Sequence, residues 1–211
     1  MIKTNVRSYY ASMTKGEDTR AAILRRAVEL TSVQGLEGLS IGRLAELSGL
    51  SKSGLFGHFG SKEALQQAVL EAVVEDFRTA VIVPALREPS GLARLQRLFE
   101  AWLAWTAGDD KVGGCPLLGA SIELDDQPGA LRHYLVEKQR AWLDCIRRIA
   151  AKAVADREFR GDLDLEQFAF EFNAIGLGFN FAYRLLDDTT APDRARTCFQ
   201  RLVAAGTTPP P

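Results

Sequence analysis

The chain has 211 residues, enough for one large or two small domains, and its 46% hydrophobic and 25% charged residues are ordinary for a globular protein. Its net charge of −1 does not by itself indicate a nucleic-acid partner, but residues 1–62 carry nine Lys or Arg against five Asp or Glu, as expected if this end meets phosphate. The sequence contains no apolar run of about 18 residues and no signal-peptide core, so we expect a cytoplasmic protein without a membrane span. The three cysteines lack CxxC spacing and the two histidines are well separated, so we expect no disulfide framework, zinc site or cofactor.

The first predicted helix covers residues 17–34. It follows residues 1–16, which we expect to form a flexible arm. Ile23 and Leu30 recur at helical spacing on one face of the segment. Gly35 then suits the left-handed residue that follows the end of a helix.

The next two predicted helices are very short. Ser40 can cap a helix that Gly49 ends after about two turns, and Ser51 can cap another over residues 52–58. Isolated helices of this length are marginal in water, so both must pack against their neighbours. The pair has the helix-turn-helix pattern, in which one exposed helix face enters the major groove of DNA.

From Ser61 onward the predicted helices are mostly longer. A fourth helix is expected to run to about Val83, where Pro84 should close it. Helical periodicity then recurs, alternating strand patterns are scarce, and residues 205–211 are predicted to be a disordered tail. The later predicted helices are one bearing Leu95 to Trp105, a short one from Cys115 to about Asp125, and three over about 128–156, 165–186 and 192–204.

The predicted fold is therefore all-α and has two parts. Residues 17–62 form an N-terminal three-helix helix-turn-helix domain. The fourth helix joins it to a C-terminal ligand-binding and dimerisation bundle, and together these cover residues 63–204.

The exposed face of the predicted helix 52–58 offers lysine, serine and histidine, which can hydrogen-bond base edges or phosphate. The surrounding stretch "LSIGRLAELSGLSKSGLFGHFGSKEAL", with "TRAAILRRAVELTSVQGLEGLS" in the first helix, resembles the DNA-binding domain of the TetR/AcrR family of transcriptional repressors. One position departs from the family pattern: Phe56 stands where tyrosine is usual, so a hydroxyl that would contact a phosphate is missing. The resemblance implies binding to a double-stranded DNA operator, with these residues at or near DNA: Ser40, Arg43, Ser51, Lys52, Ser53, Phe56, His58 and Lys62.

The second half contains "GGCPLLGASIELDDQPGALRHYL", which resembles the ligand-binding and dimerisation domain of one branch of the same family. This resemblance implies a homodimer, joined mainly through the last two long helices, that binds a palindromic operator and a small-molecule effector. Residues 165–186 are apolar on two sides, with Phe172 on one and Phe181 on the other, which indicates burial of both. Gly176 and Gly178 lie mid-helix, and we expect them to allow close approach of a partner helix.

The aromatic residues of this half can line an apolar pocket or simply fill the core. Glu171, Asn173 and Asn180 interrupt an apolar helix, and a ligand is one possible partner for such polar groups. Exposure toward the helix ends or the dimer seam is the other explanation. The candidate ligand-binding residues are Trp102, Trp105, Cys115, Trp142, Phe168, Glu171, Phe172, Phe179 and Tyr183.

Two alternatives to a ligand-released repressor stay open. Cys115 precedes Pro116 at a predicted helix N-terminus, a position that favours the thiolate form, so a thiol-based repressor could sense electrophiles or oxidants there. The other alternative is a DNA-binding adaptor without small-molecule control. An enzyme is not expected, because we find no Ser-His-Asp set, Gly-rich phosphate loop or paired metal-ligand spacing.

Overall fold

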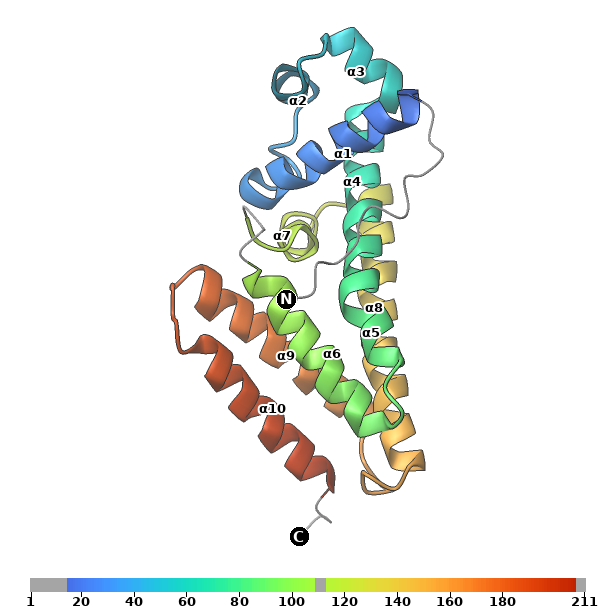
Figure 1. The fold of residues 1–211 in the computed structure, drawn as a ribbon, viewed down its shortest axis with the longest axis vertical. Coiled ribbons are helices and arrows are strands. Elements are labelled where there is room, and N and C mark those ends of the chain that lie inside the picture. The colour runs from blue at the N-terminus through green and yellow to red at the C-terminus, as the bar shows by residue number, and fades with distance from the viewer. Residues whose placement is uncertain (1–14, 109–112, 208–211) are drawn as a thin grey trace.

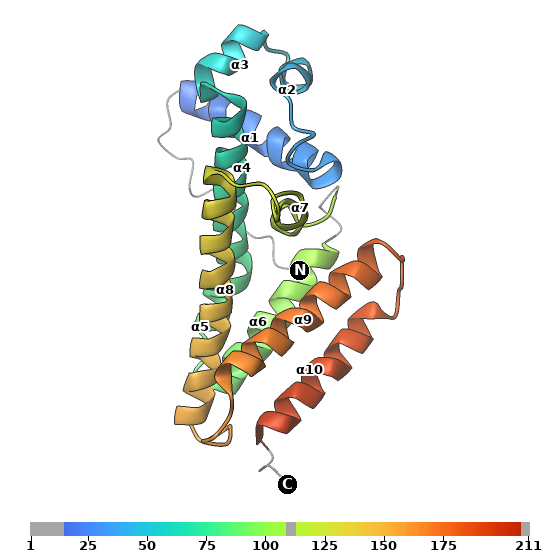
Figure 2. The same cartoon turned by 180° about the vertical axis from the view of Figure 1, so that it is seen from behind.

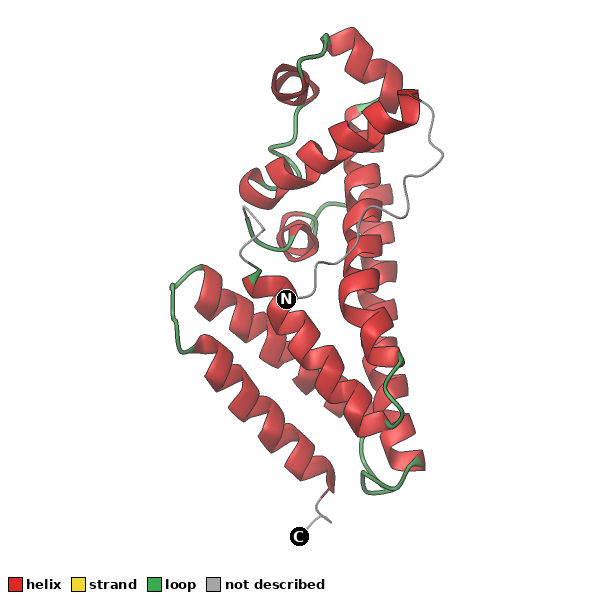
Figure 3. Ribbon diagram, in the orientation of Figure 1, coloured by secondary structure: helices red, strands yellow, loops and turns green. Residues whose placement is uncertain are grey.

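The computed structural model describes residues 15–108 and 113–207, and every regular element in these ranges is a helix (Figure 3). The prediction of an all-α protein is confirmed. The first helix begins within the predicted arm 1–16, of which residues 1–14 lie outside the described part. None of the described helices is long and apolar enough to cross a membrane. In chain order the elements are α1 (Lys15–Gln34), α2 (Ile41–Ser48), α3 (Lys52–Phe59), α4 (Lys62–Phe77), the π-helical turn η2 (Arg78–Ile82), α5 (Val83–Leu86), α6 (Gly91–Ala107), α7 (Pro116–Glu123), α8 (Ala130–Ala155), α9 (Leu165–Arg184) and α10 (Ala191–Thr207).

The helices α1 to α3 form a head at one end of an elongated molecule, and α4 leads from the head into the other half (Figure 1). The short helices begin and end as predicted. Ser40 Oγ and Ser51 Oγ each accept a hydrogen bond from the backbone N–H three residues on, and Gly49 ends α2 with a φ of 66°. Leu44 and Leu55 are fully buried, so both helices are held by packing within the head.

The fourth helix does not stop where we expected. Pro84 was predicted to close it near Val83, and this is wrong, because the helical chain continues through η2 and α5 to Leu86. The Val83 N–H bonds to the Arg78 carbonyl, five residues back, as in a π turn. Pro84 then lies in the first turn of α5, where a missing N–H costs little, so the helix passes the proline without a break.

The helices α6, α8, α9 and α10 build the second half, and α8 runs alongside α4 (Figures 1 and 2). Its core is aromatic: Phe99 stacks on Phe199 with ring centroids 4.3 Å apart, and Phe172 meets both rings edge-on at 5.6 and 5.7 Å. Such pairs contribute beyond their buried area, and they fix α6, α9 and α10 to one another.

The C-terminal helix extends further than predicted. Residues 205–211 were expected to be a tail, but α10 continues through Thr207, and only residues 208–211 lie outside the described part. Gly206 is buried against the Phe159 ring, and its carbonyl accepts a hydrogen bond from the Arg160 N–H at 2.9 Å. These contacts hold the last turn of the helix in place.

Candidate DNA-binding surface and ligand cavity

The helix α3 presents one polar face on the head. Leu55 and Phe59 point into the core, whereas Lys52 and Ser53 are exposed on the other side. Ser51 Oγ caps the helix and lies 3.1 Å from Ser53 Oγ. The exposed side therefore combines an ammonium and two hydroxyls on a short helix, and an α-helix fits the major groove of DNA.

The same helix also exposes an aromatic ring. Phe56 is 52% exposed, and His58 is partly exposed. Nothing lies within 4 Å of the place that a Cβ would take on Gly57, so the backbone between them is open to a partner. A large apolar side chain among exposed polar groups marks a contact surface.

Three further predicted DNA contacts, Ser40, Arg43 and Lys62, lie beside α3 and have protein partners. Ser40 caps α2, and Arg43 forms an ion pair with Glu46 at 3.3 Å. Lys62 Nζ donates to the Glu37 carbonyl at 3.0 Å and to Glu37 Oε2 at 3.2 Å. Exposed ion pairs contribute little free energy, so both cations can exchange a carboxylate for a phosphate.

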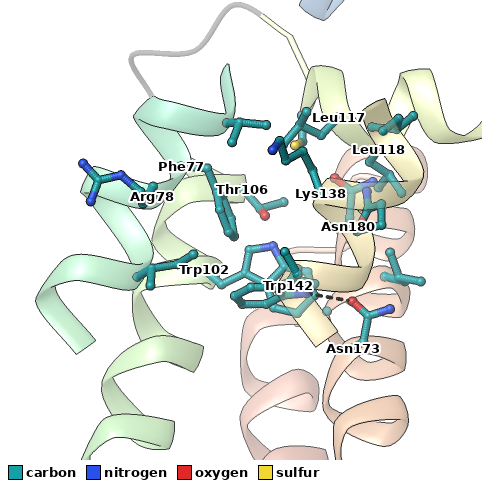
Figure 4. A pocket seen from close by; sticks show the side chains of 18 residues that line it. Phe77, Arg78, Trp102, Thr106, Leu117, Leu118, Lys138, Trp142, Asn173 and Asn180 are labelled. Atoms are coloured by element: carbon teal, nitrogen blue, oxygen red, sulfur yellow. Dashed lines mark hydrogen bonds between the residues drawn. The ribbon is translucent and has the colours of Figure 1, made fainter. Parts of the chain in front are cut away.

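A cavity of about 240 Å³ lies where α4 and η2 meet α6, α7, α8 and α9 (Figure 4). Its wall is mostly apolar. Phe77 and Trp102 each meet the Trp142 ring edge to face, with centroids 5.2 and 5.1 Å away. Leu117 and Leu118 of α7 complete another side. A concave apolar site with few polar groups is typical of small-molecule binding.

Four uncharged polar residues in the described part of the chain line the cavity: Thr106, Gln139, Asn173 and Asn180. Gln139 Nε2 donates to Ser121 Oγ at 3.0 Å. Trp142 Nε1 donates to Asn173 Oδ1 at 3.0 Å, which satisfies both of these atoms (Figure 4). Asn180 Oδ1 is buried and has no hydrogen-bond partner among the residues that the structure describes. Thr106 is 6% exposed and adds a hydroxyl. A buried oxygen without a donor costs free energy, so Asn180 is the position best suited to a polar group of a ligand.

The charged residues at the cavity are cationic, and none of the described lining residues is acidic. Lys138 Nζ donates to Glu137 Oε1 at 2.7 Å, which raises the pKa of the Lys138 ammonium. Arg78 donates two hydrogen bonds to Glu75, which lower the pKa of that carboxyl. Figure 4 shows the Arg78 guanidinium pointing away from the cavity. Both cations therefore already have a carboxylate partner outside it.

The cavity brings together only some of the predicted ligand-binding residues. Trp102, Cys115 and Trp142 line it. The other candidates do not line it: Trp105, Phe168, Glu171, Phe172, Phe179 and Tyr183.

The phenylalanines of α9 fill the core because that face of the helix turns toward α6 and α10. Phe172 is fully buried among aromatic rings, and Phe168 packs against Phe159 at 5.3 Å. Phe179 packs against Tyr183 at 5.4 Å. These residues shape the bundle, and a neighbouring face of α9 meets the cavity.

Two other predicted residues also have different environments. Trp105 packs edge-on against Phe77 with centroids 5.6 Å apart. Glu171 is exposed and accepts a hydrogen bond from Gln167 Nε2 at 2.7 Å. The cavity face of α9 is instead formed by Asn173, Gly176, Leu177 and Asn180, which recur at helical spacing. The two asparagines were noticeable in the sequence as polar breaks in an apolar helix.

Gly176 has a packing role within the chain. A Cβ at this position would overlap the six-membered ring of Trp102, so only glycine lets the indole lie against the α9 backbone. The expectation that Gly176 receives a partner helix is therefore wrong. Gly178 differs, because nothing lies within 4 Å of the place of its Cβ.

The side of α9 that faces away from the core carries an apolar stripe that the described part of this chain leaves exposed, and one member, Leu177, also borders the cavity. We call it the outer stripe of α9; its members are 41–67% exposed, and they are Phe170, Leu177, Phe181 and Leu185. Gly178 lies beside it and leaves the helix surface open. Large exposed apolar patches of this kind mark protein–protein contacts.

The helix α7 connects the cavity with the head. At its C-terminal end, Glu123 Oε1 and Oε2 accept hydrogen bonds from the backbone N–H groups of Leu36 and Glu37, at 3.0 and 2.8 Å. Before its N-terminal end, the Gly114 N–H donates to the Ser32 carbonyl at 3.1 Å. One short helix therefore lines the cavity and holds the turn that follows α1.

The three cysteines have different surroundings. Cys115 directly precedes α7, is partly exposed and lines the cavity. Burial raises the pKa of the Cys145 thiol, and Cys198 is exposed on α10. In the described ranges no group of three His, Cys, Asp or Glu side chains is placed to hold a metal ion.

Two protein-family models match the chain. Residues 23–69 match the model described as bacterial regulatory proteins, tetR family. Residues 91–199 match the model described as the tetracyclin repressor-like C-terminal domain. The first match covers most of the head and the beginning of α4, and the second covers more than half of the chain and contains most of the cavity.

Individual proteins are similar over different lengths. The class C tetracycline repressor of Escherichia coli is 44% identical over 55 residues, which span 26% of this chain and only 25% of that protein. The probable HTH-type transcriptional regulator ArpR of Pseudomonas putida is 27% identical over 184 residues, 83% of this chain and 84% of that protein. The crystal structure of a TetR transcriptional regulator from Chloroflexus aurantiacus superposes with a TM-score of 0.81 at 26% identity, covering 91% of this chain and 96% of that one.

Proposed function

Because the chain belongs to the TetR family of DNA-binding transcriptional regulators, we propose that it is a repressor that a small molecule releases from its operator. The observation that carries this proposal is the cavity of about 240 Å³. Its walls include α4 and α7, the two helices through which the bundle holds the head. A molecule that occupies the cavity therefore touches the elements that position α3.

The DNA-bound species in this proposal is a homodimer. A second copy would cover the outer stripe of α9 through the same surface, since two-fold interfaces are self-complementary. Two α3 helices would then reach adjacent major grooves, about 34 Å apart along the duplex, which predicts a palindromic operator. Binding to chromosomal DNA agrees with the cytoplasmic location expected from the sequence.

The release mechanism that we propose has two states. A ligand that pushes on Leu117 and Leu118 would displace α7, and with it the Glu123 contact to the turn after α1. The two heads of the dimer would then no longer match the spacing of the grooves. The ligand can shift this balance only by its difference in affinity for the two states.

The proposal is tested by filling the cavity. Compounds that raise the Tm of the wild-type protein are tested for release of a bound operator fragment, measured by fluorescence anisotropy. Leu118→Trp places an indole in the cavity, so operator binding by this variant should no longer respond to these compounds, whether the indole blocks their site or itself displaces α7. Leu86→Trp, at an exposed position outside the cavity, is the matched control and should respond like wild type. Equal release of both variants would show that the effector binds elsewhere.

A thiol-based response is the second candidate, and the position of Cys115 favours it. The thiol lies at the cavity and directly before α7, so a covalent adduct there would press on the same helix as a ligand. A regulator without small-molecule control is less well supported, because it gives the cavity and its unpaired Asn180 oxygen no role.

A further inference from the structure

We propose that the effector is an uncharged aromatic molecule of about ten non-hydrogen atoms that carries one ring hydroxyl, and that Asn180 holds this hydroxyl. This inference rests on the proposed function, because it names the class of ligand for the same cavity. The volume of the cavity, its aromatic wall, its charged residues and the buried Asn180 oxygen each restrict the ligand.

The volume sets the size of the ligand. A dry apolar cavity of about 150 Å³ in another protein takes up benzene. By proportion, a cavity of about 240 Å³ takes about ten non-hydrogen atoms, which corresponds to one substituted ring or two fused rings.

The wall favours a flat ring. Trp102 and Trp142 are inclined to each other by 73°, and Phe77 and Trp142 by 82°, so a planar molecule meets both ring faces and ring edges. Aromatic pairs prefer stacked or edge-to-face contacts of this kind. Gly176 fixes the wall further, because it lets Trp102 lie against the backbone of α9.

The charged residues at the cavity favour an uncharged ligand. A cation would meet no acidic side chain among the described lining residues. An anion would gain little from Lys138, whose ammonium is partly exposed to water and lies 4.9 Å from the centroid of the Tyr134 ring, because ion pairs in contact with solvent contribute little free energy. Arg78 is held by Glu75 and points away (Figure 4). Burial of an unpaired charge is costly, so a neutral molecule fits best.

The unpaired oxygen selects the polar group. Asn173 Oδ1 already accepts the indole N–H of Trp142, whereas Asn180 Oδ1 is buried at the cavity without a donor. The O and N atoms of a side-chain amide are told apart by their hydrogen-bond partners. Asn180 Oδ1 has no such partner among the described residues, so the O and N positions of this amide are interchangeable. A hydroxyl both donates and accepts, so it can pair with either atom of this amide.

The test uses four probes that share a 4-propylphenyl group on the full-length protein without DNA. They are 4-propylphenol, its methyl ether 4-propylanisole, 4-propylbenzoate and 4-propylbenzylammonium, and their Kd values are measured by isothermal titration calorimetry. The phenol should bind about five- to tenfold more tightly than the ether, since only it can donate to Asn180. The two ions should bind more weakly than the ether. Equal affinity of phenol and ether, or tighter binding of either ion, would overturn the proposal.

Two variants test which residue of the cavity binds the hydroxyl group of the phenol. Asn180→Leu should remove the preference for the phenol and leave the affinity for the ether near that of wild type. Thr106→Val is the matched control at a second polar position of the cavity and should keep the preference. Loss of the preference in Thr106→Val with retention in Asn180→Leu would overturn the role of Asn180. The four-probe comparison on wild type stands even if one variant does not fold.

Operator release is measured separately, so that the two proposals can fail independently. If the phenol binds with the predicted preference and the operator stays bound at saturation, the ligand class is supported and release by this cavity is refuted. If compounds of another chemistry bind the cavity and release the operator while the phenol does not bind, the ligand class is refuted and the proposed function is supported.

Discussion

The Glu123 contact is the part of the proposed coupling that a single substitution removes. Its two carboxylate oxygens accept the N–H groups of Leu36 and Glu37, which are 87 and 86 residues away in the chain. Glu123→Ala deletes both acceptors and leaves the cavity intact, because Glu123 does not line it. The turn after α1 should then open more often, without a change in the ligand site itself.

The size of the effect follows from the two hydrogen bonds. A hydrogen bond to a charged group contributes about 1.5–3 kcal/mol, and the bond to Glu37 is at the surface, where water competes for it. We therefore expect the pair to stabilise the closed turn by about 2–4 kcal/mol. Since about 1.4 kcal/mol corresponds to a factor of ten, the amides of Leu36 and Glu37 should exchange with solvent at least about tenfold faster in Glu123→Ala.

Amide hydrogen exchange followed by NMR measures this directly, and the chain offers internal controls. The Gly35 N–H bonds to the Thr31 carbonyl at 3.0 Å and should keep its protection. Asp125→Ala removes a nearby exposed carboxylate just beyond α7 and should change neither exchange nor operator release. Under the proposed mechanism, Glu123→Ala should also weaken the effect of ligand on operator binding. Unchanged exchange at Leu36 and Glu37, together with wild-type release, would refute the coupling through α7.

The other predictions concern packing, DNA affinity and thiol chemistry. Gly176→Ala should lower the free energy of unfolding in urea by about 1–3 kcal/mol, because the added methyl group would overlap Trp102. Gly178→Ala should leave this free energy unchanged or raise it by up to about 1 kcal/mol. Equal effects of the two would contradict this packing. Phe56→Tyr should strengthen operator binding about fivefold in anisotropy titrations, and no gain would mean that no phosphate lies within reach of the ring. If N-ethylmaleimide releases the operator, Cys115→Ser should abolish the response and Cys198→Ser should retain it; the reverse pattern would end the thiol-sensor alternative.

The parts of the fold that the sequence predicted depend on local interactions. Ser40 and Ser51 bond to backbone N–H groups three residues on, and Gly49 supplies a positive φ, so each signal lies within one turn of the feature it predicts. The helix-turn-helix unit could be placed for this reason. The continuation of the helix past Pro84 could not be predicted, because the free-energy cost of the proline depends on the π turn that precedes it.

The cavity depends on contacts that sequence spacing does not encode. The rotation of α9 decides that Asn180 meets the cavity and Phe172 meets the core, although both belong to the same apolar helix. Gly176 looked like a contact for a partner helix, and only the position of Trp102 shows its actual neighbour. Glu123 gave no signal, because its partners are backbone groups of a distant turn.

Selection of genomic fragments by the purified protein tests whether this chain binds an operator as a dimer. The best fragment is then titrated at increasing salt. We expect a palindromic site, one dimer per site, and an affinity that falls steeply with salt, as phosphate contacts from residues such as Lys62 require. Lys62→Ala should reduce that salt dependence. Recovery of no common sequence, or an affinity independent of salt, would show that the chain does not bind an operator through phosphate contacts.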